Sequence, residues 1–319
     1  MPFPVPVKKW SQKQQRGRCR EGGFVMSVGK FDYFAPQTLE EAVELLKTYG
    51  SRARVMAGGT DLMVKMRLRA ITPEVIVSIK EIKDLDGITM DSQGGLTIGA
   101  TALLSDVAAH PDINANYPAI AVAAGETANV QVRNAGTVVG NLCNASPSAD
   151  NAPTLLVMGA TVRIIGPGGE RTLPLGDFFR GPGVTALAPD EIVTSVSVPK
   201  PPRNTGVVYQ SFSGRGKLDC STVGVGVLMT MGGDTCENAR IAIGACAPIP
   251  MFAAAAEKML VGQPVDDVLL RAASKKASEE TRPIDDVRAS AAYRLKVVEV
   301  LTYRVLSEAW ANAKQEDRI

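Results

Sequence analysis

The stretch Val55-Met56-Ala57-Gly58-Gly59-Thr60-Asp61-Leu62 is the most informative part of this sequence. Its apolar start predicts a strand, which runs directly into two adjacent glycines. Such glycines let the backbone adopt positive φ angles and approach a bound group closely. Successive amide groups in a loop of this kind form a concavity that binds anions, and a pyrophosphate suits it. Taken alone, a strand followed by Gly-Gly is more often a plain turn.

A second polar stretch reads Gln131-Val132-Arg133-Asn134-Ala135-Gly136-Thr137-Val138-Val139-Gly140-Asn141-Leu142-Cys143-Asn144-Ala145-Ser146-Pro147-Ser148-Ala149-Asp150. Because residues 125–150 lack helical periodicity, we expect them to form one long irregular loop. A loop of this length needs a reason to be ordered, and wrapping a large polar ligand is one. A polar surface loop is the other interpretation that this composition allows.

The composition is that of an ordinary globular protein, with 319 residues, 45% hydrophobic and 21% charged. A net charge of +2 and an aromatic content of 5% argue against a nucleic-acid-binding protein, which concentrates basic and aromatic side chains on one face. We find no apolar run near the roughly 20 residues that a membrane span requires.

Cysteine and histidine usage narrows the possible chemistry further. The five cysteines are scattered without C-x-x-C spacing, and their odd number predicts reduced thiols in a cytoplasmic protein. We therefore expect this chain to bind neither zinc nor an iron–sulfur cluster by itself. His110 is the only histidine, which argues against a His-rich metal site.

Residues 1–29 are basic and are expected to form a disordered extension. They resemble the charged start of a signal peptide but lack its apolar stretch. A chain that truly starts at Met26 is an equally good interpretation.

The folded part is expected to begin near Phe31 and to be α+β. The capping pattern Thr38-Leu39-Glu40-Glu41 predicts a helix that ends at Tyr49. Further helices are expected at 103–109, at 117–124 and in two stretches after residue 245, the last at 289–313. Strands are expected at 54–56, 75–79, 96–100, 160–165, 192–198, 223–231 and 240–245. The linker is expected at 200–204, where consecutive prolines resist helix and central strand.

Together, the two quoted stretches resemble one family, the FAD-binding subunits of molybdenum hydroxylases such as xanthine dehydrogenase and carbon monoxide dehydrogenase. The first signature of that family, Ala-Gly-Gly-Thr-Asp-Leu, stands at 57–62. The second, Thr-x-Gly-Gly-Asn followed by Ala-Ser-Pro-x-x-Asp, appears at 137–141 and 145–150. The likeness spans about residues 30–310 and also includes 31–36, 98–101 and 190–193, with weak matches at Arg215 and Asp219.

The resemblance implies a bipartite FAD-binding domain of the vanillyl-alcohol oxidase-like (PCMH) type at 30–200. Its two α+β subdomains would cover 30–82 and 83–200, and a small C-terminal α+β domain would cover 205–312. The family's loop would hold the FAD pyrophosphate through the backbone amides of Ala57, Gly58, Gly59, Thr60, Asp61 and Leu62, and Val55 and Met56 before it are also implied to bind the cofactor. The other implied cofactor-binding residues are Thr101, Thr137, Gly140, Asn141, Asp150 and Val193.

Three departures from the family pattern matter for the expected site. Val139 replaces the first glycine of the Gly-Gly pair, so the backbone approach there is in doubt. Ser211 stands where family members often carry a lysine, so a charged contact on that side of the flavin is in doubt. The region around Thr127 lacks the aromatic residue that would shield the ring.

The resemblance further implies a division of labour between subunits. A large partner would carry the molybdenum cofactor, a small partner would carry two 2Fe-2S clusters, and the assembly would be a dimer of heterotrimers. FAD in this chain would pass electrons to NAD, a quinone, ferredoxin or oxygen. Because the flavin is itself the reactive group, no catalytic residue and no metal ligand are expected here.

Two alternatives stay open at this point. One is a self-contained flavin oxidoreductase of the vanillyl-alcohol oxidase type, which often binds FAD covalently. The other is a non-catalytic assembly protein that retains the fold.

Overall fold

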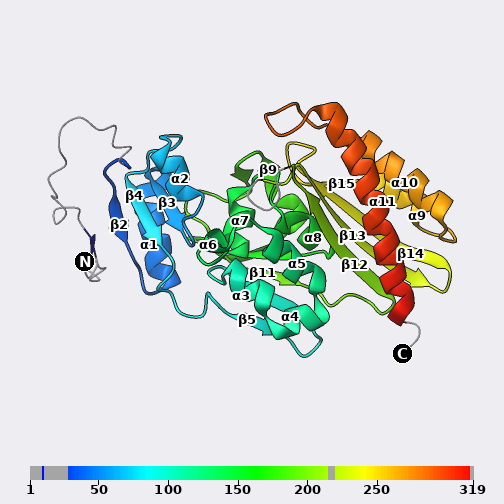
Figure 1. Ribbon diagram of the computed structural model, residues 1–319. Helices are drawn as coiled ribbons and strands as arrows, with labels where there is room; N and C mark the ends of the chain where they lie inside the picture. Colours follow the sequence, from blue (N-terminus) through cyan, green and yellow to red (C-terminus); the bar gives the residue numbers. More distant parts are fainter. Residues whose placement is uncertain (1–8, 11–27, 215–219, 317–319) are drawn as a thin grey trace.

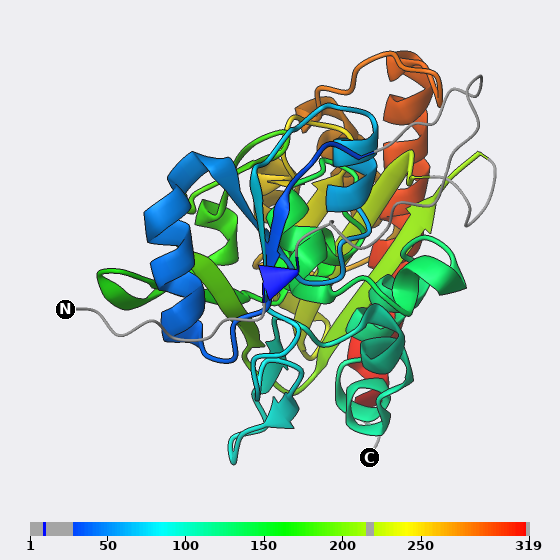
Figure 2. The ribbon, with the colours of Figure 1, turned by 90° about the vertical axis from the view of Figure 1, so that its left-hand side faces the viewer.

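The computed structural model describes residues 9–10, 28–214 and 220–316 of the chain. Three units follow one another along the molecule in Figure 1. We call them the first lobe (residues 32–78), the second lobe (residues 88–198) and the C-terminal unit (residues 205–316). Figure 2 shows the same arrangement from the side of the first lobe.

The first lobe is a small sheet with a helix between its parallel strands. Its strand order is β1-β2-β4-β3, where β1 is Lys9–Trp10, β2 is Asp32–Phe34, β3 is Ala53–Met56 and β4 is Val75–Ser78. Helix α1 (Leu39–Tyr49) begins where the Thr38 hydroxyl accepts a hydrogen bond from the Glu41 amide, and it buries Ala42, Val43 and Leu46. A single 3-10 turn, η2 (Gly50–Arg52), leads into β3. Helix α2 (Leu62–Arg67) follows the glycine loop after β3.

The second lobe is an antiparallel five-stranded sheet with helices on one side. Its order is β5-β6-β11-β7-β8, formed by Ile88–Met90, Leu96–Gly99, Ile192–Val198, Thr161–Gly166 and Gly169–Pro174. Between β6 and β7 the chain forms α3 (Leu104–Ala109), α4 (Pro111–Asn116), α5 (Pro118–Glu126), α6 (Val130–Arg133), α7 (Val138–Asn144) and α8 (Asn151–Val157). A 3-10 turn, η3 (Leu175–Asp177), and the hairpin β9 (Phe179–Gly181) and β10 (Val184–Thr185) precede β11.

The C-terminal unit is an antiparallel sheet covered on both faces. Its strands are β12 (Thr205–Phe212), β13 (Val223–Gly232), β14 (Thr235–Gly244) and β15 (Met251–Phe252), paired in that order. Helices α9 (Ala254–Leu260), α10 (Asp267–Glu280) and α11 (Ala291–Glu316) cover one face, while α5 and α8 of the second lobe contact the other. This double cover explains why nine of the ten residues of β13 are buried.

The two lobes share one hydrophobic core, which includes Val77 and Leu46 from the first lobe and Ile98, Leu142 and Val196 from the second. The C-terminal unit has a core of its own between its sheet and α9 to α11. The surfaces where the lobes meet are therefore held together by continuous apolar packing.

The predicted α+β class, the helix after Thr38, the strand before the glycine loop and the irregular linker at 200–204 are confirmed. The expectation of one irregular loop at 125–150 is wrong, because this segment contains α6 and α7. The strand predicted at 192–198 is present as β11, but its pairing with β7 shifts register between Val193 and Ser195, which the sequence did not indicate. Sequence periodicity misses both features because tertiary packing and caps, rather than intrinsic propensity, stabilise them.

Of the N-terminal residues 1–29, the structure describes 9–10 and 28–29. Lys9 and Trp10 pair with Phe34 and Tyr33, so the expected disorder of 1–29 does not hold for these two residues. The rest of the basic stretch up to residue 27, together with Arg215 and Asp219, lies outside the described residues.

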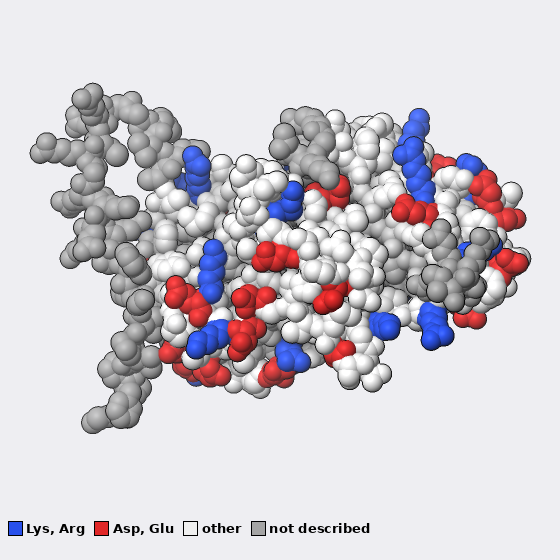
Figure 3. Space-filling view, turned by 60° about the horizontal axis from the view of Figure 1, so that its bottom comes forward, with Lys and Arg blue, Asp and Glu red and all other residues white. Residues whose placement is uncertain are grey.

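The described surface carries charges of both signs. On the face in Figure 3, lysine and arginine side chains are interspersed with aspartate and glutamate. Within the described ranges, no helix combines the length and the apolar character that crossing a membrane would need.

Candidate functional site

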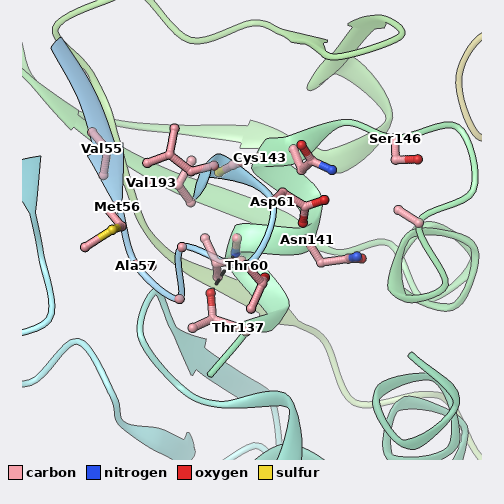
Figure 4. A pocket seen from close by; sticks show the side chains of 18 of the residues that line it. Val55, Met56, Ala57, Thr60, Asp61, Thr137, Asn141, Cys143, Ser146 and Val193 are labelled. Carbon is pink, nitrogen blue, oxygen red and sulfur yellow. Dashed lines mark hydrogen bonds between the residues drawn. The ribbon is translucent and has the colours of Figure 1, made fainter. Parts of the chain in front are cut away.

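A cavity of about 620 Å³ opens where the two lobes meet. Figure 4 shows β3 running into the glycine loop, which lies across from α7 with its side chains Thr137, Asn141 and Cys143. The β11 residue Val193 forms part of the wall (Figure 4). Cys220, in the connection that leads from β12 to β13, also lines the cavity. All three units therefore contribute to one pocket.

The glycine loop presents a row of free amide groups to this cavity. The backbone N–H groups of Gly58, Gly59 and Thr60 donate to no other backbone carbonyl in the described part of the chain. Gly59 has a φ of +76°, a conformation that residues with a side chain rarely adopt. The loop is therefore shaped to donate several hydrogen bonds to one anionic group.

Gly58 has a different role from Gly59. A Cβ atom on Gly58 would stand 2.2 Å from the carbonyl oxygen of Ala135 and 2.7 Å from the Cα atom of Gly136. The first signature stretch is thus packed backbone to backbone against the residues just before the second. The close approach of the Gly58 backbone to that of Ala135 and Gly136 joins the two lobes. It does not by itself make room for a ligand.

The second signature forms the start of α7. The Thr137 hydroxyl accepts a hydrogen bond from the Gly140 amide at 2.9 Å and so caps the helix. A Cβ atom on Gly140 would come within 2.8 Å of that hydroxyl, so a glycine fits best at this position. Val139, where the family has a glycine, is 3% exposed and belongs to the shared core. The helix therefore accommodates the departure at Val139 without disturbing the Thr137 cap.

Asn141 is oriented by a buried neighbour that sequence reasoning missed. The Asn151 Nδ2 atom donates to the Asn141 Oδ1 atom and to the Thr127 hydroxyl, each at 3.1 Å. Because Asn141 accepts through Oδ1, its own Nδ2 group is left as a donor on the pocket wall. Asn151 is 1% exposed, so this orientation is fixed from behind.

Asp150 is buried at the back of the pocket and is held by the C-terminal unit. Its Oδ1 atom accepts hydrogen bonds from the Tyr209 hydroxyl at 2.8 Å and from the Ser221 hydroxyl at 2.5 Å. Burial raises the pKa of Asp150, although these two hydroxyl donors favour the ionised form and oppose the shift.

Lys65 is the cation whose position in the pocket the sequence did not reveal. It extends from α2, and its Nζ atom donates to the Asn144 Oδ1 atom of α7 at 2.6 Å. Arg54 is the other basic residue on the lining, but its guanidinium donates to the Ser51 and Ala53 carbonyls. Lys65 therefore brings a positive charge to the seam between the lobes.

The wall around Val193 is braced by an ion pair. Arg171 contacts both carboxylate oxygens of Glu191 at 2.7 Å, and the Ala188 amide donates to the same carboxylate. The hydrogen bond from Arg171 lowers the pKa of Glu191, and partial burial opposes this shift. The pair fixes the segment that delivers Ile192 and Val193 to the pocket.

Almost all of the expected site residues meet at this cavity. Those on the lining are Val55, Met56, Ala57, Gly58, Gly59, Thr60, Asp61, Leu62, Thr137, Gly140, Asn141, Asp150 and Val193. Thr101 is not among them; its amide donates to the Leu85 carbonyl, and its neighbour Ala100 contacts the pocket instead.

Burial opposes ionisation of the thiols of Cys143, Cys236 and Cys246. Cys143 lines the pocket, and burial raises its pKa to about 12. Cys143, Cys220, Cys236 and Cys246 form no disulfide with one another. Within the described ranges, no three His, Cys, Asp or Glu side chains are grouped so as to hold a metal ion.

Comparison with known proteins matches this geometry to one family. Residues 29–201 match the family described as the FAD binding domain in molybdopterin dehydrogenase, and residues 208–309 match the CO dehydrogenase flavoprotein C-terminal domain.

Among curated relatives, the carbon monoxide dehydrogenase medium chain of Afipia carboxidovorans is 34% identical over 91% of this chain and 100% of its own length. The xanthine dehydrogenase FAD-binding subunit of Escherichia coli O157:H7 is 31% identical over 88% of this chain and 96% of its own.

Solved structures agree with these matches. A chain of carbon monoxide dehydrogenase from Hydrogenophaga pseudoflava superimposes with a TM-score of 0.87 at 34% identity, covering 90% of this chain and 99% of that one. A chain of quinoline 2-oxidoreductase from Pseudomonas putida 86 gives a TM-score of 0.84 at 28% identity, with 90% and 99% coverage.

Proposed function

This chain belongs to the family of FAD-binding subunits of molybdopterin-dependent dehydrogenases, and from that premise we propose that it carries electrons from a partner subunit to an external acceptor such as NAD. As a member of this family it is a flavoprotein subunit of an oxidoreductase. Bound FAD supplies the redox chemistry, since it exchanges electrons singly or in pairs. The chain's own residues bind and orient that group.

The single observation that carries the proposal is the fit of the inter-lobe pocket to FAD. Its volume of about 620 Å³ lies within the range of roughly 300–1,000 Å³ that is usual for small-molecule and cofactor sites. The unpartnered amides of the glycine loop match the acceptor oxygens of a pyrophosphate, and the apolar wall at Ile192 and Val193 matches an aromatic ring. Donor groups and an apolar surface are thus present together.

Each wall of the pocket has a separate task in this proposal. The backbone of residues 57–61 and the Thr60 hydroxyl would hold the pyrophosphate, with Lys65 balancing its charge. Thr137 fixes the start of α7, and Asn141 offers its Nδ2 group as a further donor. Val193 would contact a ring of the cofactor. Thr101 has no direct part, because it does not line the pocket.

Because the flavin is the reactive group, this proposal assigns no nucleophile or general base to the protein. The lining carries three carboxylates: Asp61 precedes α2, Glu191 is paired with Arg171, and Asp150 is held by two hydroxyls. Such side chains would orient the cofactor and form part of the wall around it.

The wider assembly is also part of the proposal. We expect a large partner subunit with the molybdenum cofactor and a small partner subunit with 2Fe-2S clusters, as a cytoplasmic dimer of heterotrimers. Boundaries at 30–200 for the FAD-binding domain and 205–312 for the C-terminal domain accord with the change from the second lobe to β12 at Thr205.

The test is a titration of cofactor-free chain with FAD, FMN and riboflavin, followed by flavin fluorescence. If the glycine loop holds a pyrophosphate, FAD binds at least about tenfold more tightly than FMN, which lacks the pyrophosphate. Equal binding of FAD and FMN would contradict the assigned role of residues 57–61, and no binding of any flavin would contradict the function.

A further inference from the structure

Asp150 of the second lobe links the C-terminal unit to the proposed FAD site, because it lines the pocket and accepts hydrogen bonds from two residues of that unit. This carboxylate lines the pocket and is only 8% exposed. Both hydroxyl donors, Tyr209 and Ser221, contact the same oxygen, Oδ1. The other oxygen, Oδ2, makes no hydrogen bond with any residue in the described part of the chain. One side of the carboxylate is therefore anchored and the other is left as an acceptor.

The Tyr209 hydroxyl is built into its place by the surrounding elements. Its side chain comes from β12, is 3% exposed and packs against Ala119 and Ala123 of α5. On the neighbouring strand, a Cβ atom on Gly224 would stand 2.9 Å from the Tyr209 hydroxyl oxygen. The phenol thus passes between a second-lobe helix and a glycine, and it reaches Asp150 with little freedom to move.

The backbone next to Ser221 is held in place by a buried cation, Arg294. Arg294 of α11 is 3% exposed and donates to the carbonyl of Thr222 at 2.8 Å and to that of Ala245 at 3.0 Å. Its second nitrogen contacts the Asp286 carboxylate at 2.7 Å. Because Thr222 directly follows Ser221, this clamp fixes the backbone from which the Ser221 hydroxyl extends.

We propose that Tyr209 and Ser221 are positioning residues for the FAD site, which hold Asp150 so that its Oδ2 atom accepts a hydrogen bond from a hydroxyl or N–H group of the cofactor. The C-terminal unit then controls how the cofactor is bound, although it contributes little else to the pocket wall. This inference rests on the proposed FAD-binding function.

The charges around Asp150 define what the test should measure. Besides burial, the charge of Glu126, at the end of α5, raises the pKa of Asp150, whereas burial raises the pKa of the Tyr209 phenol, which therefore stays protonated as a hydrogen-bond donor. The two hydroxyl hydrogen bonds act in the opposite direction. Removing them should therefore move the acidic limb of FAD binding to higher pH, an effect that a purely structural role would not produce.

The test is a double-mutant cycle in the full chain, with FAD affinity measured from pH 5 to 9. Tyr209→Phe and Ser221→Ala should each weaken FAD binding by about tenfold at neutral pH, the usual scale for a hydrogen bond to a charged group. In an Asp150→Asn background, the same changes should have an effect of about twofold or less. Ser221→Thr, which keeps the hydroxyl, should restore the binding.

Tyr303→Phe is the matched control, because it also removes a hydroxyl that contacts a carboxylate, Asp267, but on an exposed face of α11. It should bind FAD like the wild type. Unchanged FAD affinity in Tyr209→Phe and Ser221→Ala, or full effects that persist in the Asp150→Asn background, would overturn the inference while leaving the proposed function intact. A wild-type chain that binds no FAD would overturn both. If Tyr209→Phe does not fold, the Ser221 pair of variants decides the matter alone.

Discussion

Gly58 and Ala135 lie in backbone contact across the two lobes, so close that a Cβ atom on Gly58 would stand 2.2 Å from the Ala135 carbonyl oxygen. The two halves of the expected cofactor site are thereby joined within the protein itself. The pocket walls are positioned by packing before any ligand arrives, which lowers the ordering cost of binding.

Gly58→Ala should destabilise the chain by about 1–3 kcal/mol or more, because the added methyl group meets backbone atoms that cannot rotate away. Urea unfolding of the cofactor-free chain measures this loss. Gly168→Ala is the control, since a Cβ atom there has no neighbour within 4 Å. A Gly58→Ala variant as stable as the control would contradict the assigned contact.

Lys65→Gln should weaken FAD binding by about three- to tenfold, because it removes the charge near the pyrophosphate while keeping a donor for Asn144. The wild-type affinity should fall as salt is added, and the variant should show a smaller fall. Lys47→Gln, which removes an exposed lysine of α1, serves as the control. An unchanged affinity with an unchanged salt dependence would place Lys65 outside the cofactor site.

Asp150→Asn should make the cofactor-free chain more stable at neutral pH although it weakens FAD binding. Burial raises the pKa of Asp150, so its contribution to stability is present below its unfolded pKa of about 3.9 and is lost as pH rises through the folded value. Thermal melts of both proteins between pH 4 and 8 should show a gap that widens with pH. Asp112→Asn, at an exposed residue of α4, should show no such trend. An Asp150→Asn chain that is less stable than the wild type at pH 7 would show that the ionised carboxylate does not destabilise the folded chain.

Arg171→Met should lower the melting temperature at neutral pH and weaken FAD binding by about threefold, since it loosens the segment that carries Val193. The hydrogen bond from Arg171 lowers the pKa of Glu191, so this stabilisation is present above the unfolded pKa of about 4.3 and is lost as pH falls through the folded value. The difference in melting temperature between wild type and variant should therefore shrink below pH 4. The neighbouring exposed pair gives the control, Arg163→Met. A difference that stays constant from pH 3 to 7 would rule out the ion pair as its source.

Much of the first lobe could be predicted from local sequence signals. The Thr38 cap and the spacing of Ala42, Val43 and Leu46 define α1 without any tertiary information. The apolar residues before Gly58-Gly59 predict the strand. The two glycines predict that the loop after it binds an anionic group. These signals are short-range, and a single sequence carries them fully.

The second wall of the pocket could be recognised from its sequence signature, but its helical structure could not be predicted. Residues 138–144 include two valines, a glycine and two asparagines, all weak helix formers, so α7 exists because Thr137 caps it and Leu142 is buried beneath it. The contacts of Asp150 with Tyr209 and Ser221 span 59 and 71 residues, and nothing in the sequence pairs them. Lys65 was missed for the same reason, because its partner Asn144 lies 79 residues away.

Binding of FAD by this chain is tested most directly by a visible absorption spectrum of the purified chain, followed by heat release of any cofactor. We expect a flavin spectrum close to one FAD per chain, with FAD released unchanged. FAD that stays attached after denaturation would instead indicate a self-contained oxidase with a covalent flavin. A colourless chain that takes up no FAD, even with its partner subunits present, would contradict the flavoprotein assignment and favour an assembly protein.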